Sequence, residues 1–129
     1  MQELPKALKR KQREQSMLAH EEELRRALVP LAEKFDRWRQ GKVSSGERAL
    51  IIRDWDRGPH TELFKKYNSS FTDMNVAYAV VAGILDERKV DANLLPALER
   101  HIAFYREQLS EPRETKPNPS ITGPLPPQL

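Results

Sequence analysis

Cysteine is absent from this 129-residue chain. Without a thiol, the chain can form no disulfide scaffold, no thiolate zinc site and no cysteine nucleophile. It also has only five glycines and three histidines. None of the phosphate-binding, dinucleotide-binding, zinc-protease, nucleophile-elbow or zinc-deaminase motifs occurs in it. We therefore expect a protein that is not an enzyme and that carries no cofactor and no metal.

Long hydrophobic runs are absent too. The longest nearly apolar run, Val76–Leu85, covers ten residues, whereas a helix needs about 20 to span a bilayer. The N-terminus is basic but lacks the apolar stretch of a secretory signal. We expect no membrane insertion and a cytoplasmic location.

The composition that remains is typical of a helical domain. Charged residues make up 32% and hydrophobic residues 38%, which suits one globular domain with a polar surface. We predict an all-α protein, a compact bundle of four to six helices. Its expected parts are a basic and polar N-terminal helical arm (1–23), a helical domain (24–110) and a disordered proline-rich tail (111–129).

The first helical segment covers residues 5–40, which are rich in strong helix formers. An apolar stripe with alternating spacings of 4 and 3 follows one side of its second half: Leu24, Leu28, Leu31, Phe35 and Trp38. Pro30 lacks the amide hydrogen of a helix interior, so we expect a kink or two separate helices there. Gly41 is the expected C-terminal cap. Residues 6–23 should project beyond the core.

Turn signals divide the middle of the chain. Ser44 and Glu47 have the spacing of a capping box, which starts a helix. Gly58–Pro59 should end or bend that helix, with Gly58 in the left-handed cap conformation and Pro59 in the first turn of the next helix.

The most apolar segment predicts the centre of the fold. Residues 76–85 are apolar almost all round, so we expect a central helix near 74–88 that is buried on every side. A last helix begins near Asp91 and carries a second stripe: Leu95, Leu98, Ile102, Tyr105 and Leu109. The simplest packing places both stripes around the central helix. In the tail, Pro124 and Pro127 have the PxxP spacing of polyproline ligands, which chance also produces in so proline-rich a segment.

The stretch RDWDRGPHTE, residues 53–62, crowds acids around a histidine. Asp56 and His60 stand at i, i+4 and could face one another on a helix. A zinc site would need further ligands, and His20 and His101 lie on other predicted helices. Helix packing, capping and the helix dipole account for the other residues of the stretch. Asp56 and His60 therefore remain a candidate functional polar pair.

The N-terminal stretch KALKRKQR concentrates positive charge. Its five cations are candidate nucleic-acid contacts: Lys6, Lys9, Arg10, Lys11 and Arg13. The chain also has a helix–turn–helix outline near residues 46–68. Asp54 and Asp56 in that turn would repel phosphates, so the arm rather than the turn carries this interpretation.

Two functions remain open after the sequence. The first is a protein–protein interaction module, an adaptor or a small subunit of a larger assembly, which binds a protein partner or a second copy through the N-terminal helix. The alternative is a nucleic-acid-binding protein that uses the basic arm.

Overall fold

A computed structural model describes residues 4–110 of the chain. All regular structure in this part is helical, which confirms the predicted all-α fold. The proline-rich segment 111–129, with its PxxP motif, lies outside the described residues. The elements in chain order are α1 (Lys6–Arg39), α2 (Ser45–Trp55), η1 (Asp56–His60), α3 (Thr61–Tyr67), α4 (Thr72–Val81), η2 (Glu87–Lys89) and α5 (Leu95–Ser110).

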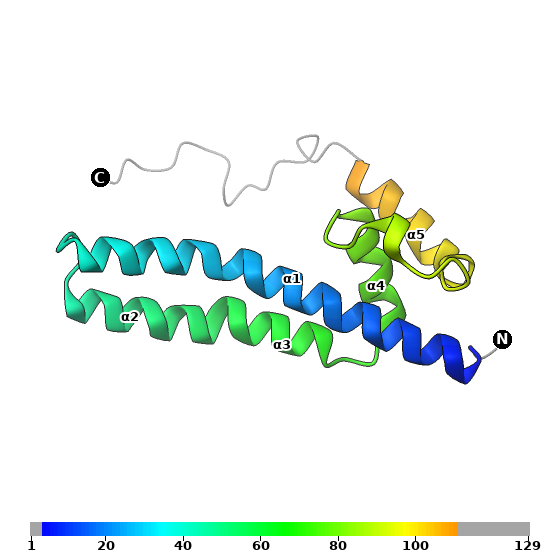
Figure 1. Ribbon diagram of the computed structural model, residues 1–129, viewed down its shortest axis with the longest axis horizontal. Coiled ribbons are helices and arrows are strands. Elements are labelled where there is room, and N and C mark those ends of the chain that lie inside the picture. Colours follow the sequence, from blue (N-terminus) through cyan, green and yellow to red (C-terminus); the bar gives the residue numbers. More distant parts are fainter. Residues whose placement is uncertain (1–3, 111–129) are drawn as a thin grey trace, which may run out of the picture.

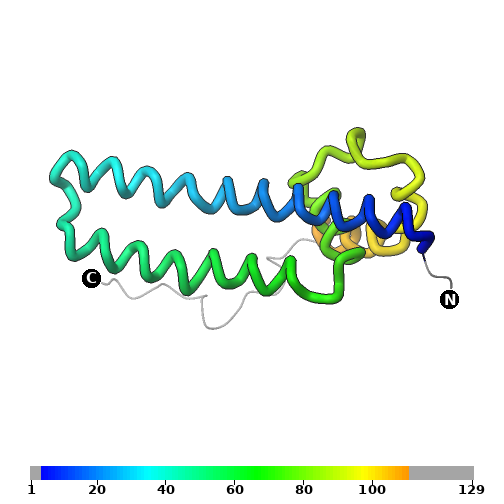
Figure 2. The backbone as a smooth tube through the Cα atoms, turned by 60° about the horizontal axis from the view of Figure 1, so that its bottom comes forward, coloured from blue at the N-terminus to red at the C-terminus, as the bar shows by residue number. Residues whose placement is uncertain are grey.

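Two parts make up the architecture. The long α1 runs antiparallel to α2, η1 and α3, which follow one another almost in line, and together they form a helical hairpin (Figure 1). The short helices α4 and α5 pack on one another, and α4 packs on the N-terminal half of α1. Figure 2 shows from a second side that the hairpin tip lies far from α4 and α5.

The first helix runs through Pro30 without a break, so the expected division into two helices is wrong. Pro30 is exposed, and its missing amide frees only one carbonyl, that of Arg26. The strong helix formers on both sides keep the helix continuous. Gly41, with φ 79°, closes α1 as expected. Its amide donates to the Trp38 carbonyl and that of Lys42 donates to the Arg37 carbonyl, the Schellman pattern.

The capping box of α2 is confirmed. The Glu47 amide donates to Ser44 Oγ and the Ser44 amide donates to the Glu47 carboxylate, both at 3.1 Å. Of the two outcomes predicted at Gly58–Pro59, an end or a bend of the helix, the end is wrong. The chain continues through one π-helical turn, η1, and Gly58 is not in the left-handed conformation. The wider turn accommodates a proline that has no amide to donate.

The core lies where α4 meets α1 and α5. Ten hydrophobic residues form it: Ala19, Val76, Ala77, Ala79, Val80, Leu85, Val90, Leu94, Leu98 and Ile102. Four of them belong to α4, so the prediction of a central apolar helix is right in kind. The expected end near 88 is wrong, because Gly83 with φ 78° turns the chain after Val81. The Ile84 and Leu85 amides both donate to the Ala79 carbonyl and close the helix.

Two packing expectations were also wrong. The apolar stripe of residues 24–38 faces α2 and η1 rather than α4. Residues 6–23 do not project freely, because Ala19 is fully buried, Ser16 is buried and Leu8 packs against the core. Ala19 and Ser16 are small, so α4 can lie close to α1 at this point.

Truncating a side chain in the core should lower the free energy of unfolding far more than truncating one at the surface. Leu98 is 1% exposed, so Leu98→Ala should lower the free energy of unfolding by about 2–5 kcal/mol. Phe104 lies on the same helix and is 49% exposed, so Phe104→Ala should cost less than about 1 kcal/mol. Urea unfolding monitored by circular dichroism measures both. Equal costs would contradict this position of the core.

Candidate interaction surfaces

Two tryptophans hold the hairpin together. The Trp55 indole donates to the Ala27 carbonyl at 3.0 Å, and the Trp38 indole donates to Ser45 Oγ at 3.1 Å. The Arg48 guanidinium lies 4.1 Å from the Trp38 ring centroid, a cation–π contact near the tip. These contacts fix the register, with Ala27 level with Trp55 and Trp38 level with Ser45.

The hairpin beyond α4 has no buried core. No residue of α2, η1 or α3 is buried. Large hydrophobic side chains on the hairpin are instead at least two-fifths exposed: Leu28, Val29, Leu50, Ile52 and Phe64. Helical domains normally bury an apolar stripe against another layer, and a solvent-exposed apolar surface often marks an interaction site.

A groove runs along one face of this hairpin. We define the hairpin groove by six residues that line a hollow of about 380 Å³: Ala27, Pro30, Leu31, Ile51, Trp55 and Pro59. Lys34 on α1 and Asp54 on α2 add charges to the same lining. The hollow thus combines an apolar floor with a few polar groups, the composition of a binding groove.

The hairpin groove begins at the edge of α4. A second hollow shares Ala27 and Pro59 with it and continues toward Glu23 and Lys66. The Lys66 ammonium lies 4.3 Å from the ring centroid of Tyr78 on α4. The groove is therefore the stretch of hairpin surface that α4 leaves uncovered.

A polar cluster closes this end of the groove. Glu23 accepts a hydrogen bond from the Lys66 ammonium at 2.7 Å and another from the Tyr67 hydroxyl. Burial, and then the hydrogen bond to the Glu23 carboxylate, raise the pKa of Tyr67 well above its ordinary value. The phenol therefore stays protonated at neutral pH and ties α1 to α3.

Sequence reasoning did not identify the hairpin groove. It assigned the stripe of α1 to the core, because an apolar stripe does not reveal how much of it a neighbour covers. One signal was present: Ala27, Pro30 and Lys34 recur at helical spacings of 3 and 4 beside the stripe. They make the semi-apolar face wider than a single seam requires.

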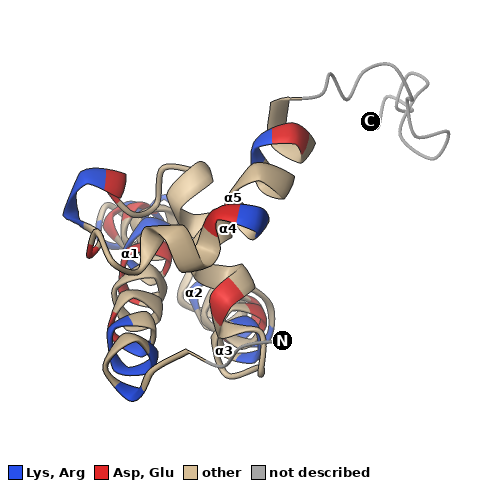
Figure 3. Ribbon diagram, turned by 90° about the vertical axis from the view of Figure 1, so that its right-hand side faces the viewer, with Lys and Arg blue, Asp and Glu red and all other residues tan. Residues whose placement is uncertain are grey.

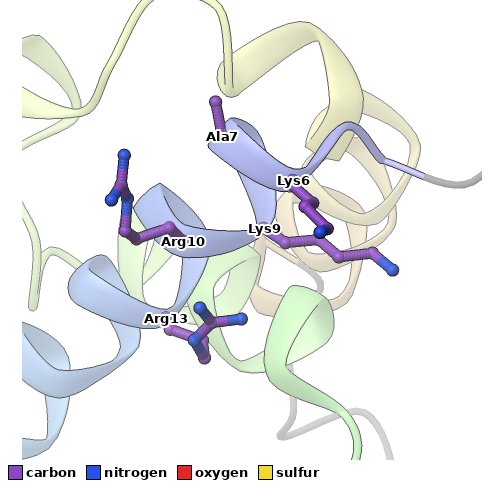
Figure 4. Close-up of a pocket in the computed structure, with 5 residues that line it drawn as sticks. All are labelled: Lys6, Ala7, Lys9, Arg10 and Arg13. Atoms are coloured by element: carbon purple, nitrogen blue, oxygen red, sulfur yellow. The ribbon is translucent and has the colours of Figure 1, made fainter.

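Four of the five N-terminal cations lie on one side of α1. Lys6, Lys9, Arg10 and Arg13 line a cleft of about 690 Å³, as their helical spacing of 3, 1 and 3 predicts. Figure 4 shows that their side chains fan out around the cleft and do not converge on one point. Viewed from that end, Lys and Arg are concentrated on the first turns of α1 (Figure 3). Such an arrangement suits an extended anionic surface better than a single phosphate.

The fifth cation, Lys11, points to the body of the protein. Its ammonium lies 3.0 Å from the Asp91 carboxylate, just before α5. The hydrogen bond from Lys11, together with the Asn93 amide, holds the pKa of Asp91 below its usual value. Lys11 therefore attaches the beginning of α1 to the core, and the structure separates it from the other four candidates.

Asp56 and His60 lie together on the hairpin surface. His60 Nδ1 is 2.8 Å from Asp56 Oδ1, and both side chains are about half exposed or more, at 46% and 65%. The His60 ring stacks on Trp55, with 5.5 Å between the centroids. Within residues 4–110, no group of three or more His, Asp or Glu side chains could hold a metal ion. The pair is therefore exposed to solvent, and no third His, Asp or Glu among the described residues completes a metal site with it.

Comparisons with known proteins assign no family to this chain. No family model matches it, and no characterised protein or solved structure matches it at a significant level. No helix in the described part of the chain is long and apolar enough to cross a membrane. The candidate functional surfaces therefore rest on their own geometry: the hairpin groove and the cationic cleft at the beginning of α1.

Proposed function

We propose that this protein is a non-enzymatic protein–protein interaction module whose binding surface is the hairpin groove. It acts as an adaptor or small subunit, and its cytoplasmic location belongs to the same proposal. The observation that supports it is the incomplete layer of the hairpin, in which α2, η1 and α3 bury no residue. A partner that adds a layer over the groove would remove its apolar lining, with Leu31, Ile51 and Trp55, from water.

The rigidity of the hairpin suits this role. The tryptophan hydrogen bonds to Ala27 and Ser45 fix the register of the two helices. The Schellman turn and the capping box define the loop between them. A preformed groove loses little conformational entropy when it binds, so affinity does not depend on a costly rearrangement.

A charge placed in the groove should abolish partner capture. Pro30 is exposed and lines the groove, so Pro30→Lys places an ammonium on the surface that a partner would cover, and it also restores a helix-forming residue. Affinity for the partner should fall at least tenfold, because an unpaired charge is expensive to bury. Pull-down from the native host with quantitative mass spectrometry measures the loss.

Val29 offers the matched control. It is the neighbouring residue on α1, is 52% exposed and does not line the groove. Val29→Lys should retain the partner, and circular dichroism should show equal helix content for both variants. Equal capture by Pro30→Lys and the unmodified chain would contradict the groove as the binding surface.

A second candidate function is nucleic-acid binding through the cationic cleft. The grouping of Lys6, Lys9, Arg10 and Arg13 on one side of α1 favours it. The first turn of that helix contains no acidic residue. Contacts of this kind act on phosphates and are insensitive to base sequence.

Salt titration tests this second function. Four phosphate contacts on duplex DNA predict that the logarithm of the binding constant falls with the logarithm of salt concentration with a slope of about −3 to −4. Changing Lys6, Lys9, Arg10 and Arg13 together to Gln should remove binding, whereas Lys11→Gln should retain most of it. Fluorescence anisotropy with DNA and RNA at two salt concentrations measures this. Absence of binding at low salt would eliminate the function.

A further inference from the structure

We infer that the partner of the hairpin groove is a second copy of this chain, packed antiparallel so that two hairpins form a four-helix layer. This inference rests on the proposed function, because it identifies the protein that covers the groove. Three properties of the described residues support it: the distribution of charge along the hairpin, the size of the bare face and the position of α4.

Charge changes sign along the hairpin. The two tryptophan contacts place residue 32 level with about residue 50, which divides the hairpin into two halves. The tip half, residues 33–49, holds five Lys or Arg against three Asp or Glu, a net charge of +2. The half near α4, residues 20–32 and 50–63, holds four against six, a net charge of −2.

This polarity selects one orientation of two hairpins. Antiparallel packing places the +2 half of each copy over the −2 half of the other, whereas parallel packing places halves of the same net charge over one another. The two hollows repeat the trend, with Lys34 in the hairpin groove toward the tip and Glu62 in the second hollow toward α4. Among the described residues, neither Lys34 nor Glu62 makes an ion pair. Both charges therefore remain available to a partner.

The bare face is large enough for a specific dimer. From the tip to Glu62 the hairpin is about 27 Å long, at 1.5 Å per residue, and two packed helices are about 20 Å wide. Two such faces would bury on the order of 1,100 Å², near the lower limit for specific interfaces. We expect a reversible dimer with a dissociation constant in the micromolar range.

The position of α4 also favours an antiparallel pair. Lys66 marks the end of the groove because it contacts Tyr78 of α4. In an antiparallel pair the α4 and α5 helices of the two copies lie at opposite ends, and each hairpin tip ends beside the other copy's α4. A parallel pair would bring both sets of short helices to the same end of the same face, where they would collide.

The oligomeric state of the full chain tests the inference. Sedimentation equilibrium between about 5 and 200 µM should show a monomer–dimer equilibrium. Pro30→Lys should weaken it at least tenfold, because its ammonium faces the basic tip half of the other copy, and Val29→Lys should leave it unchanged. Higher salt should weaken the dimer of the unmodified chain, since opposite charges contribute to it.

Single cysteines test the orientation, because the chain has no cysteine of its own. Lys34→Cys places a thiol near the two-fold axis, so a short bis-maleimide should link two copies. Gln40→Cys places it at the tip, where antiparallel copies hold the two thiols roughly 27 Å apart and no short link should form. Efficient linking of Gln40→Cys with none of Lys34→Cys would overturn the antiparallel arrangement.

Failure of this inference is distinguishable from failure of the proposed function. A chain that stays monomeric at about 200 µM would overturn the second copy as the partner, because this concentration is well above a micromolar dissociation constant. This holds whatever other protein binds the groove. The groove would still be an interaction surface if Pro30→Lys, unlike Val29→Lys, lost a different protein in the pull-down. Dimerisation that both lysine variants retain equally would place the interface elsewhere and overturn the inference as well.

Discussion

The close approach of α4 to α1 is the contact on which the rest of the structure depends. Ala19 is fully buried at this point and belongs to the same cluster as Val76, Ala79 and Leu98. Small side chains on both helices let the backbones approach, so the larger side chains of α5 can cover the remaining side of α4. Because only the N-terminal half of α1 takes part, the second half must find another partner within the chain, and α2 and α3 supply it.

This division of α1 explains why the hairpin is incomplete. A pair of helices can bury the seam between them but not the faces on either side of it. Trp38 and Trp55 lie at that seam, where their rings provide apolar contact. Their indole hydrogen bonds fix the alignment of the two helices. The core of the protein therefore ends at the edge of α4, and the apolar side chains beyond it are exposed. The proposed interaction and the proposed dimer both follow from this geometry.

Two polar contacts attach α1 to its neighbours. Glu23, Lys66 and Tyr67 link α1 to α3 beside α4, and Lys11 attaches the beginning of α1 to Asp91. Only the first of these contacts is substantially shielded from water, and an exposed ion pair such as Lys11–Asp91 contributes little to stability. Its effect is on position, because it turns Lys11 away from the side of α1 that carries the other four cations.

The sequence by itself determined the helical class, the capping box at Ser44, the cap at Gly41 and the apolar character of residues 76–81, because these depend on neighbours within a few positions. It predicted a break or a bend at Pro30 and at Gly58–Pro59, and the chain does not break at either, because the surrounding helix tolerates a lost amide through exposure or a widened turn. Only the tertiary structure decided which face of α1 meets α4 and which meets α2. A helical stripe records that a face is apolar, but the residues that cover it come from segments distant in the chain. The hairpin groove exists because α4 packs across the N-terminal half of α1 and leaves the rest of the hairpin uncovered.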